Sequence, residues 1–222
     1  MSESGNALPW ENLSRDGVTP MKRAGLLVDP RRCVGCHACA VACKTEYDLP
    51  LGGFRIRTHY LQRPDRPTHF FLPIMCQHCQ DAPCLSACPN DAVVRLQDGR
   101  IEINQKACKT HTGCIKACPY DAIYLDPQTH KADNCNLCTP RTDVGMEPAC
   151  VAACPTEALR FGDLGDPNSD ISKIAARDQA RPMRPEHNTN PTVRYVGLEP
   201  WMEKQAKGVQ LDEGDNTIIY ER

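Results

Sequence analysis

The sequence has few aromatic residues and no long apolar run. Aromatic side chains make up 5% of the 222 residues, and cysteine alone contributes 15 residues to a hydrophobic fraction of 41%. No stretch approaches the ~20 apolar residues that a membrane-spanning helix needs, and residues 1–24 carry charges where a signal peptide has an apolar core. We therefore expect no transmembrane helix and no signal peptide. The apolar core should be small, so bound metal would help to stabilise it.

Excess charge and enzyme motifs are also lacking. The formal net charge is −2, from 26 basic and 28 acidic side chains, so the composition indicates neither a nucleic acid nor a membrane surface as the main partner. The sequence contains no glycine-rich phosphate loop and no nucleophile motif. We therefore expect a protein that is not an enzyme on its own.

Cysteine, in contrast, is abundant. Disulfide-rich domains are small and secreted, and 15 is an odd number, so a disulfide framework is disfavoured. All fifteen cysteines fall instead into four runs. The runs are Cys33, Cys36, Cys39 and Cys43; Cys76, Cys79, Cys84 and Cys88; Cys108, Cys114 and Cys118; and Cys135, Cys138, Cys150 and Cys154.

The spacing within the runs is typical of iron–sulfur ligands. Closely spaced thiolates let one loop hold several corners of a cubane cluster, while a cysteine three residues further on, often followed by proline, reaches a neighbouring cluster. Structural zinc usually takes two separated pairs of ligands. The sequence therefore predicts iron–sulfur clusters, with a zinc-binding scaffold as the alternative.

Three of the runs end in a repeated motif. Residues 88–93, 118–123 and 154–159 each read cysteine, proline, any residue, an acid, alanine and an aliphatic residue, which indicates duplicated units. A helix is expected over about 38–47. Residues 93–103 read as a hairpin with an Asp98-Gly99 turn, and 123–125 as a short strand. Short strands and helices around cysteine loops predict an α+β, ferredoxin-like body.

The third run has one cysteine too few. If it follows the spacing of the first run, the vacant ligand position falls on His111. His111 could bind iron through a ring nitrogen, or three cysteines could hold a 3Fe–4S cluster; either would remove one thiolate charge and raise the potential. A histidine without contact to iron is the third possibility. His37 and His78 are expected to be exposed spacers within the ligand loops, and Lys44 a solvated lysine.

These runs resemble the iron–sulfur subunits of the dimethyl-sulfoxide-reductase family of molybdenum oxidoreductases. The motifs that carry the resemblance are residues 28–39, 76–84 and 114–120, and it covers about residues 24–162. It implies two nested ferredoxin-like two-cluster units with long irregular loops. The first and fourth runs would form one unit, and the second and third runs, about residues 70–125, would form another inserted within it. Sequence alone would also permit pairing of the runs in chain order.

The resemblance also implies the ligands of each cluster. The first group is Cys33, Cys36, Cys39 and Cys154; the second is Cys135, Cys138, Cys150 and Cys43; the third is Cys76, Cys79, Cys84 and Cys118; the fourth is Cys108, Cys114 and Cys88 with His111 as a possible ligand. The cofactors would be three 4Fe–4S clusters plus one 3Fe–4S or His-ligated 4Fe–4S cluster. In the family the first cluster lies nearest the molybdenum cofactor and the fourth nearest the membrane subunit.

Outside the body, two terminal segments have a different composition. We expect residues 1–23 to be an N-terminal extension, 24–164 the four-cluster body, and 165–222 an extended C-terminal arm. The arm is polar and contains several prolines, so it is expected either to be disordered or to become ordered on a catalytic partner. Trp10 and Trp201 are candidate interface anchors.

By this resemblance, the protein is expected to relay single electrons between a molybdopterin catalytic subunit and a quinone-linked integral membrane subunit. The complex would be an oxidoreductase of sulfite or another sulfur compound. The alternative is a free-standing polyferredoxin that carries electrons by diffusion. The expected location is the cytoplasmic side of a membrane, held there by a partner, or else the periplasm after export with a signal-bearing partner.

Overall fold

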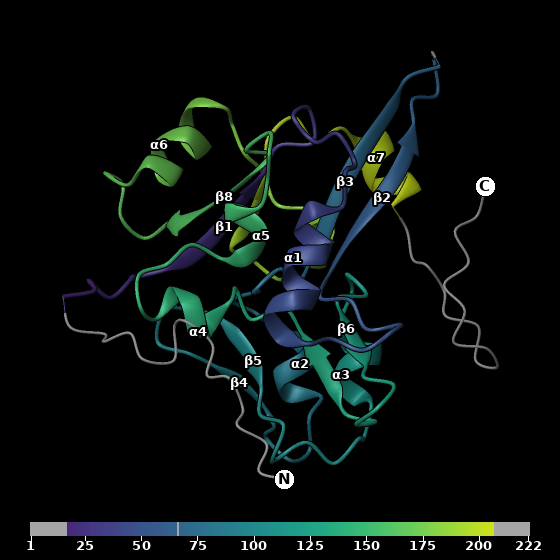
Figure 1. Ribbon diagram of the computed structural model, residues 1–222, viewed down its shortest axis with the longest axis vertical. Coiled ribbons are helices and arrows are strands. Elements are labelled where there is room, and N and C mark those ends of the chain that lie inside the picture. The colour runs from purple at the N-terminus through teal and green to yellow at the C-terminus, as the bar shows by residue number, and fades with distance from the viewer. Residues whose placement is uncertain (1–16, 66, 207–222) are drawn as a thin grey trace, which may run out of the picture.

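The computed structural model describes residues 17–65 and 67–206, which form short helices and four small sheets of the α+β class (Figure 1). None of the described helices is long and apolar enough to span a membrane. Trp10 and the rest of residues 1–16 lie outside the described part of the chain, as do residues 207–222.

A three-stranded sheet organises one half of the molecule. Its central strand β1 (Ala24–Val28) is buried along its whole length. Strand β8 (Leu159–Asp163) pairs antiparallel with β1 on one edge, and β9 (Val193–Tyr195) pairs parallel on the other. The sheet therefore joins three segments that are far apart in the sequence.

The remaining strands form three two-stranded ribbons. The longest pairs β2 (Ile56–Gln62) with β3 (His69–Met75), and it projects from the body in Figure 1. The other two pair β4 (Val93–Arg95) with β5 (Ile101–Ile103), and β6 (Ile123–Leu125) with β7 (Ala132–Asn134). The expected hairpin over residues 93–103 and the strand at 123–125 are confirmed.

The helices adjoin the cysteine runs. Helix α1 (Ala38–Tyr47), confirmed with the expected bounds, packs against α5 (Ala149–Ala152). Helix α2 (Pro83–Ser86) packs against α3 (Gly113–Ala117), and α4 (Thr139–Thr142) follows Cys138. Helices of the first and fourth runs are therefore neighbours, as are helices of the second and third.

The expectation of an extended C-terminal arm is wrong for residues 165–206. This segment forms α6 (Asp170–Arg177), the 3-10 helix η1 (Pro185–His187), β9 and α7 (Pro200–Gln205). Its apolar side chains are sparse but deeply buried: Met183, Tyr195 and Met202 are at most 1% exposed. Trp201 packs edge-to-face on Phe70 of β3, with the ring centroids 5.6 Å apart. The segment is thus part of the folded body, because a few large side chains anchor it there.

Candidate iron–sulfur centres

The ligand loops depend on residues with left-handed backbone conformations. Gly35 in the first run has φ +67°, and a Cβ atom there would overlap the ring of Phe71. His37 and His78 adopt φ +59° and +46° within the first and second runs. Left-handed residues among right-handed ones curl the backbone so that its N–H groups turn toward the inside of the loop. Such loops can wrap an anionic cluster.

The repeated Cys-Pro motif forms a turn with the same hand at each copy. Its acidic residues Asp91, Asp121 and Glu157 have φ of +48°, +51° and +53°. An L-residue seldom adopts this conformation, but aspartate tolerates it better than most. The sequence repeat is therefore also a conformational repeat.

These turns direct backbone amides at cysteine sulfur. The N–H of Ala92 donates to Cys88 Sγ at 3.3 Å, and the N–H of Ala158 donates to Cys154 Sγ at 3.2 Å. Burial acts to raise the pKa of each thiol, but the amide hydrogen bonds outweigh it and the pKa of each is lowered. The turn therefore favours thiolate, the form that binds iron.

In the first group, Cys39 is near Cys33 and Cys154. Burial raises the pKa of Cys39 to about 11, and the charges of Cys33 and Cys154 act in the same direction. Thr58 lies next to the same sulfur, with Oγ1 3.9 Å from Cys39 Sγ. Cysteines separated by more than a hundred residues in the chain thus meet at one place.

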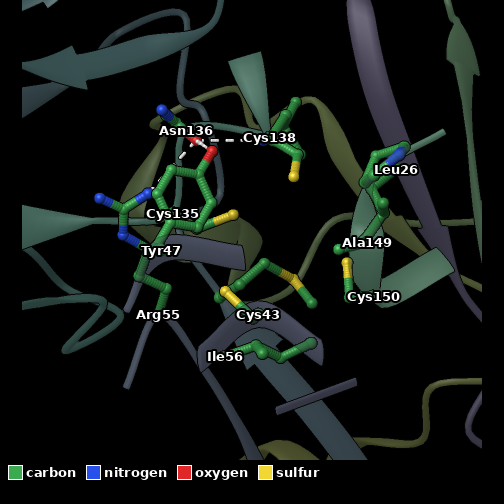
Figure 2. A pocket seen from close by; sticks show the side chains of 13 residues that line it. Leu26, Cys43, Tyr47, Arg55, Ile56, Cys135, Asn136, Cys138, Ala149 and Cys150 are labelled. Carbon is green, nitrogen blue, oxygen red and sulfur yellow. Dashed lines mark hydrogen bonds between the residues drawn. The ribbon is translucent and has the colours of Figure 1, made fainter. Parts of the chain in front are cut away.

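The second group surrounds a cavity whose lining includes Cys43, Cys135, Cys138 and Cys150 (Figure 2). Figure 2 shows the four sulfur atoms around a common space. Burial raises the pKa of Cys150 well above its usual value, and the other three cysteines of the group raise it further.

The third and fourth groups are formed by the second and third runs, whose helices α2 and α3 pack against each other. Burial raises the pKa of Cys84 to about 12, and the charges of Cys118 and Cys79 add to this effect. Burial also raises the pKa of Cys76, and the charge of Cys118 raises it further. In the fourth group, burial raises the pKa of Cys114, and the nearby charges of Cys88 and Cys108 act in the same direction.

Cysteines of one group lie near cysteines of the next group in the order first, second, third, fourth. Cys150 of the second group is near Cys39 of the first, and Cys76 of the third is near Cys135 of the second. Cys84 of the third group is likewise near Cys114 of the fourth. The first group therefore adjoins the second, the second adjoins the third, and the third adjoins the fourth.

The donor set suits iron–sulfur clusters. All fifteen cysteines are free thiols, and most are buried or half-buried. Within the described residues, no three His, Cys, Asp or Glu side chains converge as ligands of a single metal ion, which a mononuclear zinc site would require. A cubane holds its thiolates further apart, at the corners of a larger body. The residues present therefore fit clusters of several irons.

The expectations for the neighbouring polar residues need correction. His78 is fully buried, not an exposed spacer: its Nδ1 accepts the N–H of Ile101 at 2.9 Å, because the ring faces the β4–β5 ribbon. Burial, and then the charge of Arg100, lowers the pKa of His78 to about 3. His37 is half-buried, with Nε2 2.6 Å from the hydroxyl of Tyr60.

Lys44 is not a freely solvated side chain. Its Nζ donates to the carbonyls of Pro50 and Gly53 at 2.7 and 2.8 Å, and lies 4.4 Å from the ring centroid of Phe54. Lys44 therefore fastens the loop between α1 and β2. His111, by contrast, is exposed, whereas Cys108 and Cys114 on either side of it are buried.

Two polar residues beside the cysteine groups, Arg55 and Thr189, belong to no recognisable sequence motif. Arg55 forms an ion pair with Asp133 beside the second group, and Thr189 lies near Cys79 of the third group and acts to lower its pKa against the larger effect of burial. Their partners are 78 and 110 residues away in the chain, so no local pattern could have identified them.

Comparison with known proteins gives one family. A 4Fe-4S dicluster domain matches residues 67–164. The chain is 37% identical to a tetrathionate reductase subunit of Salmonella typhimurium, over 82% of this chain and 75% of the relative. It is 32% identical to a putative dimethyl sulfoxide reductase iron-sulfur subunit of Halobacterium salinarum, over 88% of each sequence. It is 40% identical to a polysulfide reductase subunit of Wolinella succinogenes, over 70% of this chain and 84% of the relative.

The alignments cover most of this chain and most of each relative. The chain therefore belongs to the family of iron–sulfur electron-transfer subunits of molybdoenzymes.

Proposed function

We propose that the protein relays single electrons along four clusters held by the four cysteine groups, between a molybdopterin catalytic subunit and a quinone-linked membrane subunit. Each bound cluster supplies one-electron redox chemistry. The protein holds the clusters through thiolates, directs amides at their sulfur ligands, and keeps water away by burial. It needs no substrate site of its own, and the subunit is non-catalytic.

The succession of cysteine groups, each next to the following one, is the observation that supports this proposal, and we infer a row of clusters from it. Cys39 and Cys150 link the first group to the second, Cys135 and Cys76 the second to the third, and Cys84 and Cys114 the third to the fourth. A row gives an electron one path with an entrance and an exit, which suits a subunit placed between two partners. It also supports the nested pairing of the runs over pairing in chain order.

The surface near the first group suits a partner protein. Cys36 is exposed, and the apolar side chains of Val34, Val41 and Tyr60 are 57%, 61% and 57% exposed. Val41 and Tyr60 line the same cavity as His37 of the first run. Apolar side chains gathered around one end of an electron path are typical of an interface. We assign this end to the catalytic subunit.

The names of the relatives favour a sulfur-compound substrate for the complex. They are subunits of reductases for tetrathionate and polysulfide, as well as dimethyl sulfoxide. We propose that the catalytic partner acts on an inorganic sulfur compound, sulfite being one candidate. Purified complex should exchange electrons between a quinol analogue and only those sulfur compounds that its catalytic subunit accepts.

Anaerobic purification of the chain with its neighbours tests the relay. We expect a brown complex with about fifteen or sixteen irons per copy of this chain, together with a larger molybdenum-containing subunit. Four separate one-electron couples should titrate. A colourless protein with stoichiometric zinc would reject the proposal, and a stable monomer that exchanges electrons with soluble reductases would favour a diffusing polyferredoxin.

The fourth group is proposed to hold a 3Fe–4S cluster or a 4Fe–4S cluster with His111 as its fourth ligand. The presence of only three cysteines in this group supports an unusual cluster. Electron paramagnetic resonance separates the two forms, because the oxidised three-iron cluster is paramagnetic. If His111 binds iron, His111→Ala should change that cluster's spectrum; if it does not, the spectrum should stay the same.

The location is also a proposal. We place the complex on the cytoplasmic face of the membrane, with a periplasmic position by co-export as the alternative. Fusion of a reporter that is active in only one compartment to the C-terminus would distinguish the two.

A further inference from the structure

Arg55 is the charged side chain at the cavity of the second group. Among the described residues that line this cavity, Arg55 alone carries a full side-chain charge apart from the cysteines; its partner Asp133 is not among them. Figure 2 shows Arg55 and Tyr47 on one side of the cavity, and Ala149 and Cys150 on the other. Arg55 therefore belongs to the cavity wall of the second group, whereas its carboxylate partner does not.

The guanidinium group is held in one position. Its Nε and Nη2 donate to the two carboxylate oxygens of Asp133 at 2.8 and 2.9 Å, and its carbon lies 3.7 Å from the ring centroid of Tyr47. The hydroxyl of Tyr124 donates to the same carboxylate at 2.7 Å, and the hydroxyl of Tyr47 donates to Asn136 at 2.6 Å. A cation fixed in this way cannot swing into solvent.

Burial makes this charge effective. The side chains of Arg55 and Asp133 are 13% and 10% exposed. A buried ion pair contributes little net stability compared with apolar residues of the same size, because both charges lose their hydration. The same burial weakens dielectric screening, so the charges act strongly on groups nearby. The pair is therefore better explained by its effect on the second group than by stability.

We propose that Arg55, oriented by Asp133, is a positioning residue that raises the reduction potential of the second cluster. The inference rests on the proposed relay. Reduction adds one electron to the second cluster; no bond forms or breaks and no proton is needed. A fixed cation at the cavity wall stabilises that added negative charge, so the second cluster accepts the electron more readily.

Opposite substitutions of the two partners test the inference. Arg55→Gln in the intact complex should lower one of the four midpoint potentials, with the reduction equilibrium changing about tenfold, or ~59 mV for a one-electron couple. Asp133→Asn leaves the cation unopposed and should raise the same potential. Arg55→Lys should fall between wild type and Arg55→Gln. Redox titration followed by electron paramagnetic resonance resolves the four couples.

The ion pair of Arg63 and Asp65, whose Nε–Oδ1 distance is 2.7 Å, provides the matched control. Arg63→Gln and Asp65→Asn should leave all four potentials unchanged. A general structural disturbance would shift several of the four midpoint potentials, or would shift one of them in the same direction in Arg55→Gln and in Asp133→Asn. Either result overturns the inference. So does an unchanged potential in Asp133→Asn with full iron content. If the wild-type complex shows no iron–sulfur couples, the relay itself fails.

Discussion

The hydroxyl of Tyr120 lies 2.6 Å from the hydroxyl of Thr189, and both side chains are 5% exposed. Tyr120 belongs to the turn after the third cysteine run, and Thr189 to the C-terminal segment. The carbonyl of Thr189 also accepts the N–H of Asp81 at 3.0 Å. The C-terminal segment is therefore fastened across the second and third runs.

Thr189→Val should weaken this attachment. The substitution keeps the shape of the side chain but leaves the hydroxyl of Tyr120 without its nearest partner, which costs about 1–3 kcal/mol. Anaerobic thermal unfolding of the holoprotein measures the loss. In a double-mutant cycle with Tyr120→Phe, the two losses should be less than additive; full additivity would show that the contact is not energetically coupled.

Gly35→Ala should destabilise the first ligand loop. The new methyl group would clash with the ring of Phe71. Alanine would also have to adopt a left-handed backbone conformation, which glycine tolerates much better. Gly99→Ala is the matched control, since Gly99 has φ +87° but a Cβ there meets nothing within 4 Å. We expect Gly99→Ala to cost about 1 kcal/mol and Gly35→Ala more, with loss of iron from the first cluster. Equal shifts in melting temperature would contradict the clash.

Met202→Ala should cost about 2–5 kcal/mol, as expected for a fully buried methionine. If residues 200–205 instead became ordered only on a partner, the isolated protein would unfold at the same temperature with or without the substitution. Leu51→Ala provides the contrast, because Leu51 is 92% exposed and its loss should fall within about 0.5 kcal/mol of zero.

Acidification should destabilise the protein partly through His59. Burial first, and then the charges of Arg57 and Arg184, lower the pKa of His59 to about 4. The pKa of this histidine in the unfolded state is near 6.5, so between pH 6.5 and 4 the unfolded state binds a proton that the folded state does not. The contribution of His59 to the free energy of unfolding is therefore complete above pH 6.5 and is lost as the pH falls toward 4, by at most about 3 kcal/mol.

His59→Gln should therefore flatten the decline of apparent melting temperature between pH 6.5 and 4.5. The control is His69→Gln, which changes an exposed ring on the same β2–β3 ribbon. A decline that is as steep in His59→Gln as in wild type would mean that other groups, including the clusters, account for all of the acid sensitivity.

Local patterns predicted the parts of the fold that depend on local interactions. The Asp98-Gly99 turn gives the β4–β5 ribbon because Gly99 supplies the left-handed conformation of the turn. The bounds of α1 follow from the first cysteine run and the residues after it. Sequence alone did not predict the place of β9, because three residues of moderate strand preference carry no signal for the partner strand β1.

Long-range polar contacts were also beyond the sequence. Arg55 lies just before β2 and meets Asp133 of β7, which is 78 residues away in the chain. His78 occupies a loop position where either side could have faced solvent, and its burial depends on the β4–β5 ribbon that covers it. The cysteine runs indicated the kind of cofactor; the surrounding electrostatic environment needed the three-dimensional structure.

The pairing of β1 with β8 and β9 constrains the order of events during biosynthesis. The ribosome makes Leu26 long before its sheet partners Phe161 and Val193. In the proposed grouping, Cys39 likewise waits for Cys154, whereas the second and third runs are close in the chain. With that grouping, iron delivered during translation would fill the third and fourth groups first, and the first and second groups could be loaded only after synthesis is nearly complete.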